Sequence, residues 1–206
     1  MSASGLYAYC LVRPVADFQS QPYRRRMRPP ETLETERLRL RPVRRSDAGD
    51  IFGYASAVPS TRFMPFPRHC NIAASLAFAE RCESQWASGA SFPWAVIEKA
   101  SGRFLGVIEL RLSPPKADFG YIFGEASWGR GFATEAVCTV VAWAIAQPPI
   151  FRVWATCHPD NAASAAVLRK AGLSHEATLE NWEARPQLGE LAGPSHFYAR
   201  TRSPNG

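Results

Sequence analysis

The sequence lacks the apolar segments of membrane and secreted proteins. No window of its 206 residues approaches the roughly eighteen uninterrupted apolar residues that a membrane-spanning helix needs. The N-terminal stretch MSASGLYAYCLVRPV also lacks the basic lead, the long apolar run and the small-residue cleavage site of a secretory signal. We therefore expect a cytoplasmic protein with no membrane partner.

Patterns of disulfide and metal-binding residues are missing as well. The five cysteines are odd in number, widely spaced and contain no CxxC, which predicts reduced thiols rather than a disulfide framework. The four histidines form no HxxxH or HExxH motif, so we predict no structural or catalytic metal. These residues are Cys10, Cys70, Cys82, Cys138, Cys157, His69, His158, His175 and His196.

Excess positive charge is confined to the N-terminal end. The formal charge is +6, of which residues 1–30 carry +4, so the remaining chain has an unremarkable +2. Residues 1–30 show no periodicity and end in PYRRRMRPP, which predicts an irregular basic extension, followed by one domain over residues 31–206. A natural start at Met27, with the upstream residues added by the gene model, is a further hypothesis.

Strand and helix patterns alternate along the domain. We expect a strand in TLETERLRLRPV and a helix in SDAGDIFGYASA with Ser46 as N-cap. A loop in VPSTRFMPFPRHC, which contains three prolines, should follow, and then a helix after Asn71. Three strands follow: FPWAVIE and FLGVIELRL, joined by the turn KASGR, and then ADFGYIF. After them we expect a helix from Phe132, the strand FRVWATC, a helix that ends at Gly172, and two strands in the tail. This order predicts a single mixed α/β (α+β) domain.

A glycine-rich turn, SWGRGFATEAV from Ser127 to Val137, joins an aromatic strand to an apolar helix. Such a turn directs free backbone N–H groups and the positive end of the helix dipole to one point, where a phosphate can bind. Gly129 and Gly131 allow close backbone approach and torsions closed to other residues. The alternative is a plain strand-to-helix connection with two turn glycines.

Two common nucleotide motifs do not fit this turn. A P-loop needs GxxxxGK[ST], and no GK[ST] occurs in the chain. A dinucleotide fingerprint needs GxGxxG, but Thr134 stands at the third glycine, and Cys157 and His158 stand where the ribose-binding acid is expected. The remaining nucleotide candidate is a seat for the pyrophosphate of coenzyme A.

Three motifs in one order strengthen this last candidate. TERLRLRP (Thr35 to Pro42), WGRGFATEA and the downstream NAASAAVLRKAGL together resemble the GNAT superfamily of acetyl-CoA-dependent N-acetyltransferases, in particular its RimJ/RimL-like branch. The resemblance covers about residues 33–180. It implies a single GNAT-type domain, with a mostly antiparallel sheet flanked by helices and with splayed central strands.

The resemblance also implies a coenzyme site. Backbone N–H groups of the glycine turn would hold the pyrophosphate, with Trp128 where the wider family has Gln or Arg. The end of the strand ADFGYIF would pair with pantetheine, and Asn161 would contact the coenzyme arm. The implied acetyl-CoA residues are Ile122, Phe123, Trp128, Gly129, Arg130, Gly131, Phe132, Ala133, Thr134, Asn161 and Ser164. A helix cap is the alternative role for Asn161.

The implied reaction is direct attack of a neutral amine on the acetyl thioester. Glu109 is the leading candidate for the general base, with a solvent-facing strand residue as its alternative. Other candidates for the base are Asp118, Tyr121 and Glu125.

The acid that protonates the leaving thiolate departs from the family pattern. Leu168 stands where many relatives have a tyrosine, so we predict that Ser164 takes this role. Glu135 and His158 are expected to be structural.

We therefore predict an acetyl-CoA-dependent N-acetyltransferase acting on a primary amine, either a protein N-terminus or a small molecule. Its partners would be acetyl-CoA and the amine acceptor, with nucleic acid disfavoured and a monomer or homodimer expected. The alternatives are a non-catalytic acyl-CoA sensor and a module that binds nucleic acid or a protein partner through its arginine-rich arm.

Overall fold

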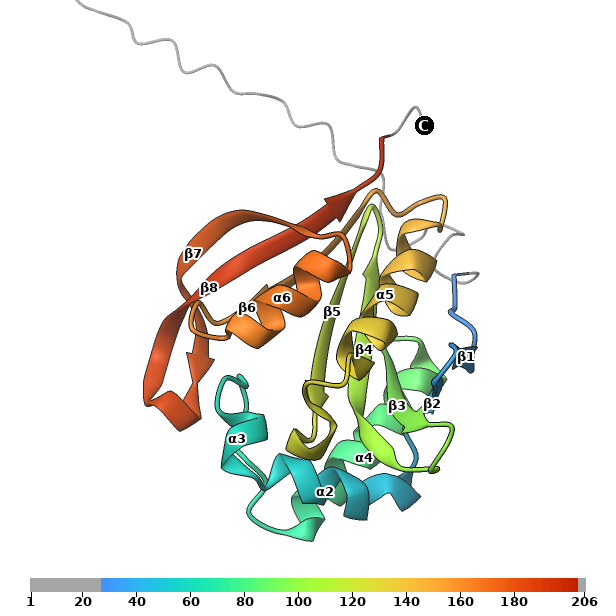
Figure 1. Ribbon diagram of the computed structural model, residues 1–206, viewed down its shortest axis with the longest axis vertical. Coiled ribbons are helices and arrows are strands. Elements are labelled where there is room, and N and C mark those ends of the chain that lie inside the picture. Colours follow the sequence, from blue (N-terminus) through green and yellow to red (C-terminus); the bar gives the residue numbers. More distant parts are fainter. Residues whose placement is uncertain (1–26, 204–206) are drawn as a thin grey trace, which may run out of the picture.

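The computed structural model describes residues 27–203. At its centre lies one eight-stranded sheet with the order β1-β2-β3-β4-β5-β6-β8-β7 (Figure 1). All neighbouring strands are antiparallel except β5 and β6, which are parallel. This confirms the predicted mixed, mostly antiparallel sheet. The strands are β1 (Leu33–Glu34), β2 (Leu38–Pro42), β3 (Phe92–Glu98), β4 (Phe104–Ser113), β5 (Lys116–Phe123), β6 (Arg152–Cys157), β7 (Ser174–Arg185) and β8 (Glu190–Thr201).

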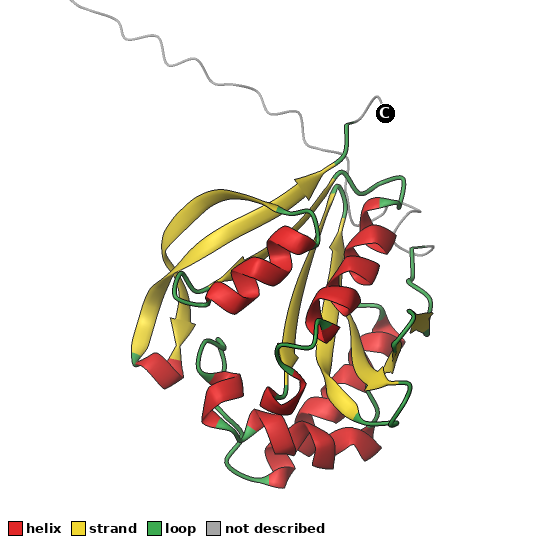
Figure 2. Ribbon diagram, viewed as in Figure 1, coloured by secondary structure: helices red, strands yellow, loops and turns green. Residues whose placement is uncertain are grey.

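Helices cover both faces of this sheet (Figure 2). They are α2 (Ala48–Ala55), α3 (Val58–Thr61), α4 (Ile72–Ser88), α5 (Phe132–Ile145) and α6 (Ala162–Lys170), with single 3-10 turns η1 (Arg45–Asp47), η2 (Glu125–Ser127) and η3 (Pro186–Leu188). Within residues 27–203, no helix is both long enough and apolar enough to cross a membrane.

Neighbouring residues of the central strands belong to two different cores. Ile108 and Phe123 pack in the larger core beneath α5 and α6, whereas Val107 and Ile122 pack in the smaller core beneath α2 and α4. Because side chains alternate across a strand, this part of β4 and β5 contributes to a core on each face of the sheet, and this explains the apolar runs LGVI and YIF.

The sheet opens between its two parallel strands. β5 and β6 pair only from Lys116–Arg152 to Asp118–Trp154, although β5 continues to Phe123 and β6 to Cys157. The two strands diverge beyond the last pair, so the backbone of β5 from Phe119 onward lacks a strand partner on that side. This is the predicted splay.

Three local predictions for the N-terminal half are wrong. The expected first strand is two strands, because Thr35 N–H bonds Leu38 O at 3.0 Å in a tight turn. Ser46 lies inside η1, and Asp47 is the N-cap of α2. The segment after α2, expected to be loop, contains the four-residue helix α3, which has a proline in its first turn.

The basic extension falls largely outside the described residues, which include only its positions 27–30. These four have no helix or strand. Met27 packs against the larger core, and Arg28 Nη2 donates to the carbonyls of Trp86 at 2.5 Å and Ala87 at 2.8 Å. Arg28 thus binds the C-terminal end of α4, where a cation is favourable.

Candidate functional site

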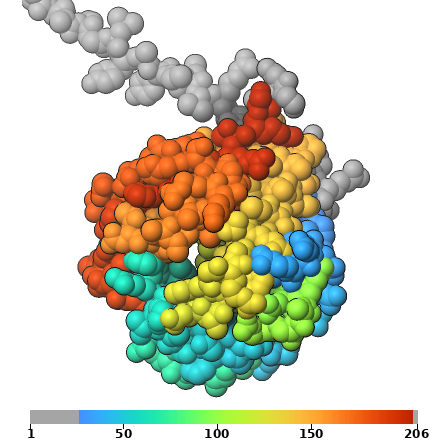
Figure 3. All heavy atoms as spheres, in the orientation of Figure 1, coloured from blue at the N-terminus to red at the C-terminus, as the bar shows by residue number. Residues whose placement is uncertain are grey.

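Two adjoining cavities lie where β5 and β6 diverge. The loop cavity, about 530 Å³, lies between the glycine turn, the start of α6 and the end of β5. The sheet cavity, about 800 Å³, lies against β4, β5 and β6 and is closed by α4, residues 63–71 and the end of β7. Figure 3 shows a hollow where the yellow, orange and teal atoms of these segments meet. Residues that line both cavities mark their junction; they are Phe63, Met64, Tyr121, Ile122, Asn161 and Ser164.

The loop cavity contains an uncapped helix N-terminus. Gly129 and Gly131 have φ of +72° and +80°, a left-handed conformation that favours glycine. Gly131 is the N-cap of α5 and provides no side-chain hydrogen bond, whereas Asn71 caps α4 and Asn161 caps α6 with side-chain oxygens. The first-turn N–H groups of α5 therefore remain available for an anion in the cavity.

Most of the predicted coenzyme residues line the loop cavity. They are Ile122, Phe123, Trp128, Gly129, Gly131, Phe132, Ala133, Thr134, Asn161 and Ser164. The side chain of Arg130 instead bonds Glu98 Oε1 at 2.8 Å, away from the cavity. The indole Nε1 of Trp128 donates to Phe123 O at 2.9 Å, so this carbonyl already has one partner.

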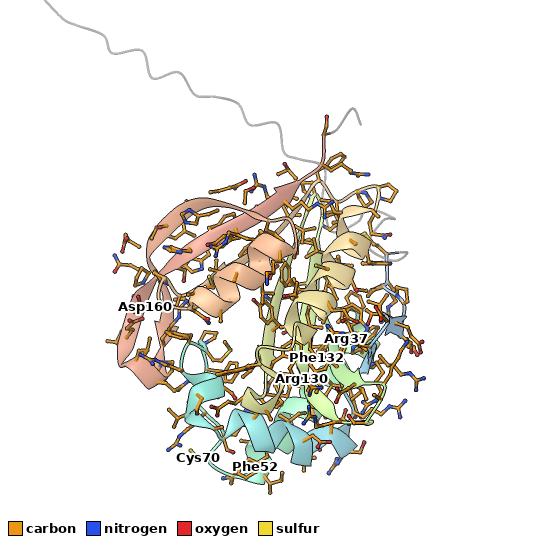
Figure 4. All side chains as sticks on the ribbon, viewed as in Figure 1. Arg37, Phe52, Cys70, Arg130, Phe132 and Asp160 are labelled. Atoms are coloured by element: carbon orange, nitrogen blue, oxygen red, sulfur yellow. The ribbon has the colours of Figure 1, made fainter. Side chains whose placement is uncertain are left out.

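Arg37 fixes the glycine turn from the neighbouring strand pair. Its Nη1 donates to Arg130 O at 2.9 Å and its Nε to Glu135 Oε2 at 2.7 Å. The guanidinium carbons of Arg37 and Arg130 lie 4.8 and 4.5 Å from the centre of the Phe132 ring (Figure 4). Burial raises the pKa of Glu135, but hydrogen bonds from Thr35 and Arg37 outweigh it and lower that pKa. Glu135 thus connects the TERL and ATEA motifs.

Gly106 of β4 permits a close backbone approach at the end of β5. An added Cβ there would lie 2.2 Å from Ile122 O and 2.8 Å from Phe123 Cα. We predict that Gly106→Ala lowers the free energy of unfolding by roughly 1–3 kcal/mol. Gly120→Ala is the matched control, because the nearest atom to its Cβ is Arg111 Nη2 at 3.9 Å. Thermal unfolding measures both; equal losses would contradict the prediction.

A tyrosine lies at the junction, although not at the position where relatives have one. Tyr121 of β5 hydrogen-bonds Ser164 of α6 through their hydroxyls, at 2.7 Å. Burial raises the pKa of Tyr121, so the phenol is protonated at neutral pH. Burial also raises the pKa of the neighbouring Cys157 thiol to about 11, with a hydrogen bond to Ser164 acting in the opposite direction. Leu168, in contrast, is fully buried in the core.

Glu109 lies on β4 and lines the sheet cavity. Its side chain is 26% exposed, and Oε2 lies 3.2 Å from Arg111 Nη1. Arg111 also binds Asp118 Oδ2 at 2.5 Å, so Asp118 is engaged in an ion pair. Glu109 also pairs with Arg111, but its partly exposed carboxylate lines the sheet cavity, whereas Asp118 and the exposed Glu125 of η2 line neither cavity.

Two further residues have clear structural contacts. Asn161 Oδ1 accepts from Ser164 N at 3.0 Å, which is the capping bond. His158 is 5% exposed, accepts from Asp160 N through Nδ1 at 3.1 Å and stacks on Phe63 with ring centres 5.0 Å apart. The amide nitrogen of Asn161 stays free for a ligand, because its oxygen alone makes the cap.

Sequence reasoning missed several residues around the cavities. Lys170, at the end of α6, adds a cation to the loop cavity. Gln187 of η3 donates to Thr61 O at 2.7 Å and Phe66 O at 2.9 Å, joining two segments far apart in sequence. Arg81 of α4 lines the sheet cavity. No local motif marks Gln187 or Arg81, because their contacts are formed only by the fold, whereas Lys170 lies within the quoted motif NAASAAVLRKAGL.

The fold and site define the class of protein. Residues 37–174, more than half of the chain, match the family model described as an acetyltransferase (GNAT) domain. The chain therefore belongs to this family, which confirms the predicted acetyltransferase class.

Individual relatives agree with this assignment. The uncharacterized N-acetyltransferase p20 of Bacillus licheniformis is 26% identical over 156 residues, covering 74% of this chain and 88% of p20. Among solved structures, the microcin C7 self-immunity acetyltransferase MccE, in complex with acetyl-CoA and AMP, aligns with a TM-score of 0.75 and 18% identity, covering 84% and 98% of the two chains. The RimL ribosomal L7/L12 alpha-N-protein acetyltransferase, in complex with coenzyme A, aligns with a TM-score of 0.74 and 18% identity, covering 84% and 99%.

Proposed function

We propose that the protein transfers the acetyl group of acetyl-CoA to a primary amine. The observation that carries this proposal is the uncapped α5 N-terminus beside the β5–β6 opening, at a junction between two cavities. One cavity suits the phosphates of the donor, the unpaired edge of β5 suits the amides of pantetheine, and the other cavity suits the acceptor. The MccE and RimL neighbours carry acetyl-CoA and coenzyme A, which supports the choice of donor.

In this proposal the amine nitrogen attacks the thioester carbonyl at the junction, the N–C bond forms and the C–S bond breaks. Glu109 takes the proton of the amine, directly or through water. Tyr121 returns a proton to the departing thiolate through Ser164, since the two hydroxyls are hydrogen-bonded.

Ligand-induced stabilisation tests the donor. At about a hundred times its dissociation constant, acetyl-CoA should raise the melting temperature by roughly 5–10 °C. NAD and ATP should give no comparable shift, because neither can extend an acylated pantetheine arm along β5. Absence of any shift at millimolar acetyl-CoA would overturn the proposal.

Enzyme and sensor differ in turnover. The alternative of a non-catalytic acyl-CoA sensor predicts the same thermal shift but no release of free coenzyme A thiol over a panel of amines. The third alternative, a binding module, relies on an arm whose residues 1–26 lie outside the described part of the chain.

The hydroxyl pair gives a prediction about the acid step. Tyr121→Phe and Ser164→Ala should each lower kcat about tenfold, and the double variant should be little worse than either. A thiolate is a good leaving group, so we expect no larger loss. The comparison is made with kcat at saturating acetyl-CoA; losses that multiply in the double variant would show that the two residues act independently.

A further inference from the structure

The charged residues of the sheet cavity are unevenly matched. Four arginines and two glutamates line it: Arg68, Arg81, Arg111, Arg185, Glu109 and Glu183. A cavity built for a polycation would be expected to show the opposite balance, because like charges repel across a confined space.

The ion pairs show which arginines of the sheet cavity carry its unmatched positive charge. Arg111 lies 3.2 Å from Glu109, and Arg185 lies 3.2 Å from Glu183. Arg68 and Arg81 have no ion pair with any acid in the described part of the chain. The unmatched positive charge therefore lies on the wall formed by α4 and the segment before it, opposite the sheet.

Arg81 and Glu109 lie close enough to influence the same buried group. The Cys82 thiol has its pKa raised to about 12, mainly by burial; Glu109 raises it further and Arg81 lowers it. The cavity thus has an accessible carboxylate on its floor and an unpaired guanidinium on its wall. The unpaired positive charge is therefore concentrated on one wall, whereas the floor holds Glu109 beside its partner Arg111.

The wall that carries Arg81 is otherwise aromatic. The His69 ring lies between Phe66 and Phe78, with ring centres 6.3 and 6.2 Å away, and Arg81 Cζ lies 5.3 Å from the centre of the Phe78 ring. His69 Nδ1 lies 2.7 Å from Ser75 Oγ, and burial, followed by the charge of Arg81, lowers the pKa of His69. This imidazole is therefore neutral at physiological pH and adds no charge to the aromatic wall.

We propose that the acceptor amine also carries a carboxylate and an apolar side group. Its ammonium faces Glu109, its carboxylate faces Arg81 and Arg68, and its side group lies against the aromatic wall. The cavity of about 800 Å³ has room for a hydrophobic amino acid or the first residues of a peptide. This inference rests on the proposed amine acetylation and narrows its acceptor. The carboxylate can belong to a free amino acid or to an acidic residue near a peptide N-terminus.

The first experiment compares acceptors that differ only in charge. With the full chain and saturating acetyl-CoA, release of thiol is measured for L-phenylalanine and L-phenylalaninamide, and for Phe-Asp-Gly-amide and Phe-Asn-Gly-amide. We expect kcat/KM at least about tenfold higher for the carboxylate member of one pair, and the pair that responds identifies the source. Replacing the carboxylate of an acceptor by an amide lowers the pKa of its amine, so a larger fraction of that amine is the neutral nucleophile. Differences in amine protonation therefore favour the amide member of each pair and cannot explain a higher kcat/KM for the carboxylate member.

Variants connect the preference to the arginines. Arg81→Gln and Arg68→Gln should each reduce the ratio of kcat/KM between acid and amide, by about tenfold for Arg81, and Arg81→Glu should reverse it. Arg45→Gln is the matched control, because Arg45 is an exposed arginine on η1 outside the cavity. The acid preference of the unmodified protein should also weaken with added salt.

Binding without turnover separates this inference from the proposed function. With coenzyme A in place of acetyl-CoA, the same four acceptors are titrated by calorimetry. Equal binding of both members in each pair, or no binding by either carboxylate acceptor, would overturn the inference while acetyl transfer to other amines could stand. Loss of acetyl-CoA binding itself would instead count against the proposed function.

Discussion

Replacing Ala133 by aspartate should weaken acetyl-CoA binding about a hundredfold or more. Ala133 lies in the first turn of α5 and lines the loop cavity, where we place the pyrophosphate. Two unit charges about 4 Å apart near a protein surface interact with about 4 kcal/mol, and here they repel. At Gly131, an added Cβ would lie 3.4 Å from Arg37 Nη2, which could neutralise a new carboxylate, so Ala133 gives the clearer test.

Ala133→Asn is the matched control for this substitution. It has the same shape as aspartate but no charge, so the difference between the two variants isolates repulsion from crowding. Aspartate in a first helical turn is favourable to the helix dipole, so the unliganded aspartate variant should melt no lower than the asparagine variant. Calorimetric titration with acetyl-CoA measures the affinities; equal affinities of the two variants would exclude the pyrophosphate from this turn.

The geometry of the loop cavity, where we place the donor, could be predicted because its information is local. Gly129 and Gly131, the free first turn of α5 and Asn161 each lie within a short motif. A positive φ or a helix cap depends on a few neighbouring residues, so the sequence indicates it directly. The role of Arg130 was not predictable in this way, because its partner Glu98 is 32 residues away.

The sheet cavity, where we place the acceptor, could not be predicted because segments far apart in the sequence form it. Arg81 comes from α4, Glu109 from β4 and Arg185 from the end of β7, while residues 63–71 close the top. Gln187 holds that segment to η3 across more than a hundred residues. Periodicity indicates the faces of single elements, but not which faces meet across a fold.

The divergence of β5 and β6 depends on how the whole fold packs, not on the sequence of either strand. The sequence FRVWATC is typical of a buried strand along its whole length, yet only Arg152, Val153 and Trp154 pair with β5. The family resemblance, rather than strand propensity, predicted this opening. The same limit explains Tyr121: its place in ADFGYIF was known, but its contact with Ser164, 43 residues later, depends on how β5 and α6 cross the opening.

Glu109→Gln should lower kcat about a hundredfold at neutral pH while leaving the affinity for acetyl-CoA unchanged. Glutamine keeps the size and the hydrogen-bonding capacity of the side chain but cannot accept the proton of the amine. Arg111 retains Asp118 as an ion-pair partner, so the floor of the cavity should stay in place. Glu125→Gln is the control, since Glu125 lines neither cavity.

The pH dependence distinguishes a base from a residue that only positions the acceptor. As pH rises toward the pKa of the acceptor amine, solvent supplies the neutral nucleophile and a base becomes less necessary. The deficit of Glu109→Gln should therefore shrink with increasing pH, whereas a positioning defect should persist and raise KM for the amine. A deficit that stays constant from neutral pH to the pKa of the amine would assign the proton transfer to another group.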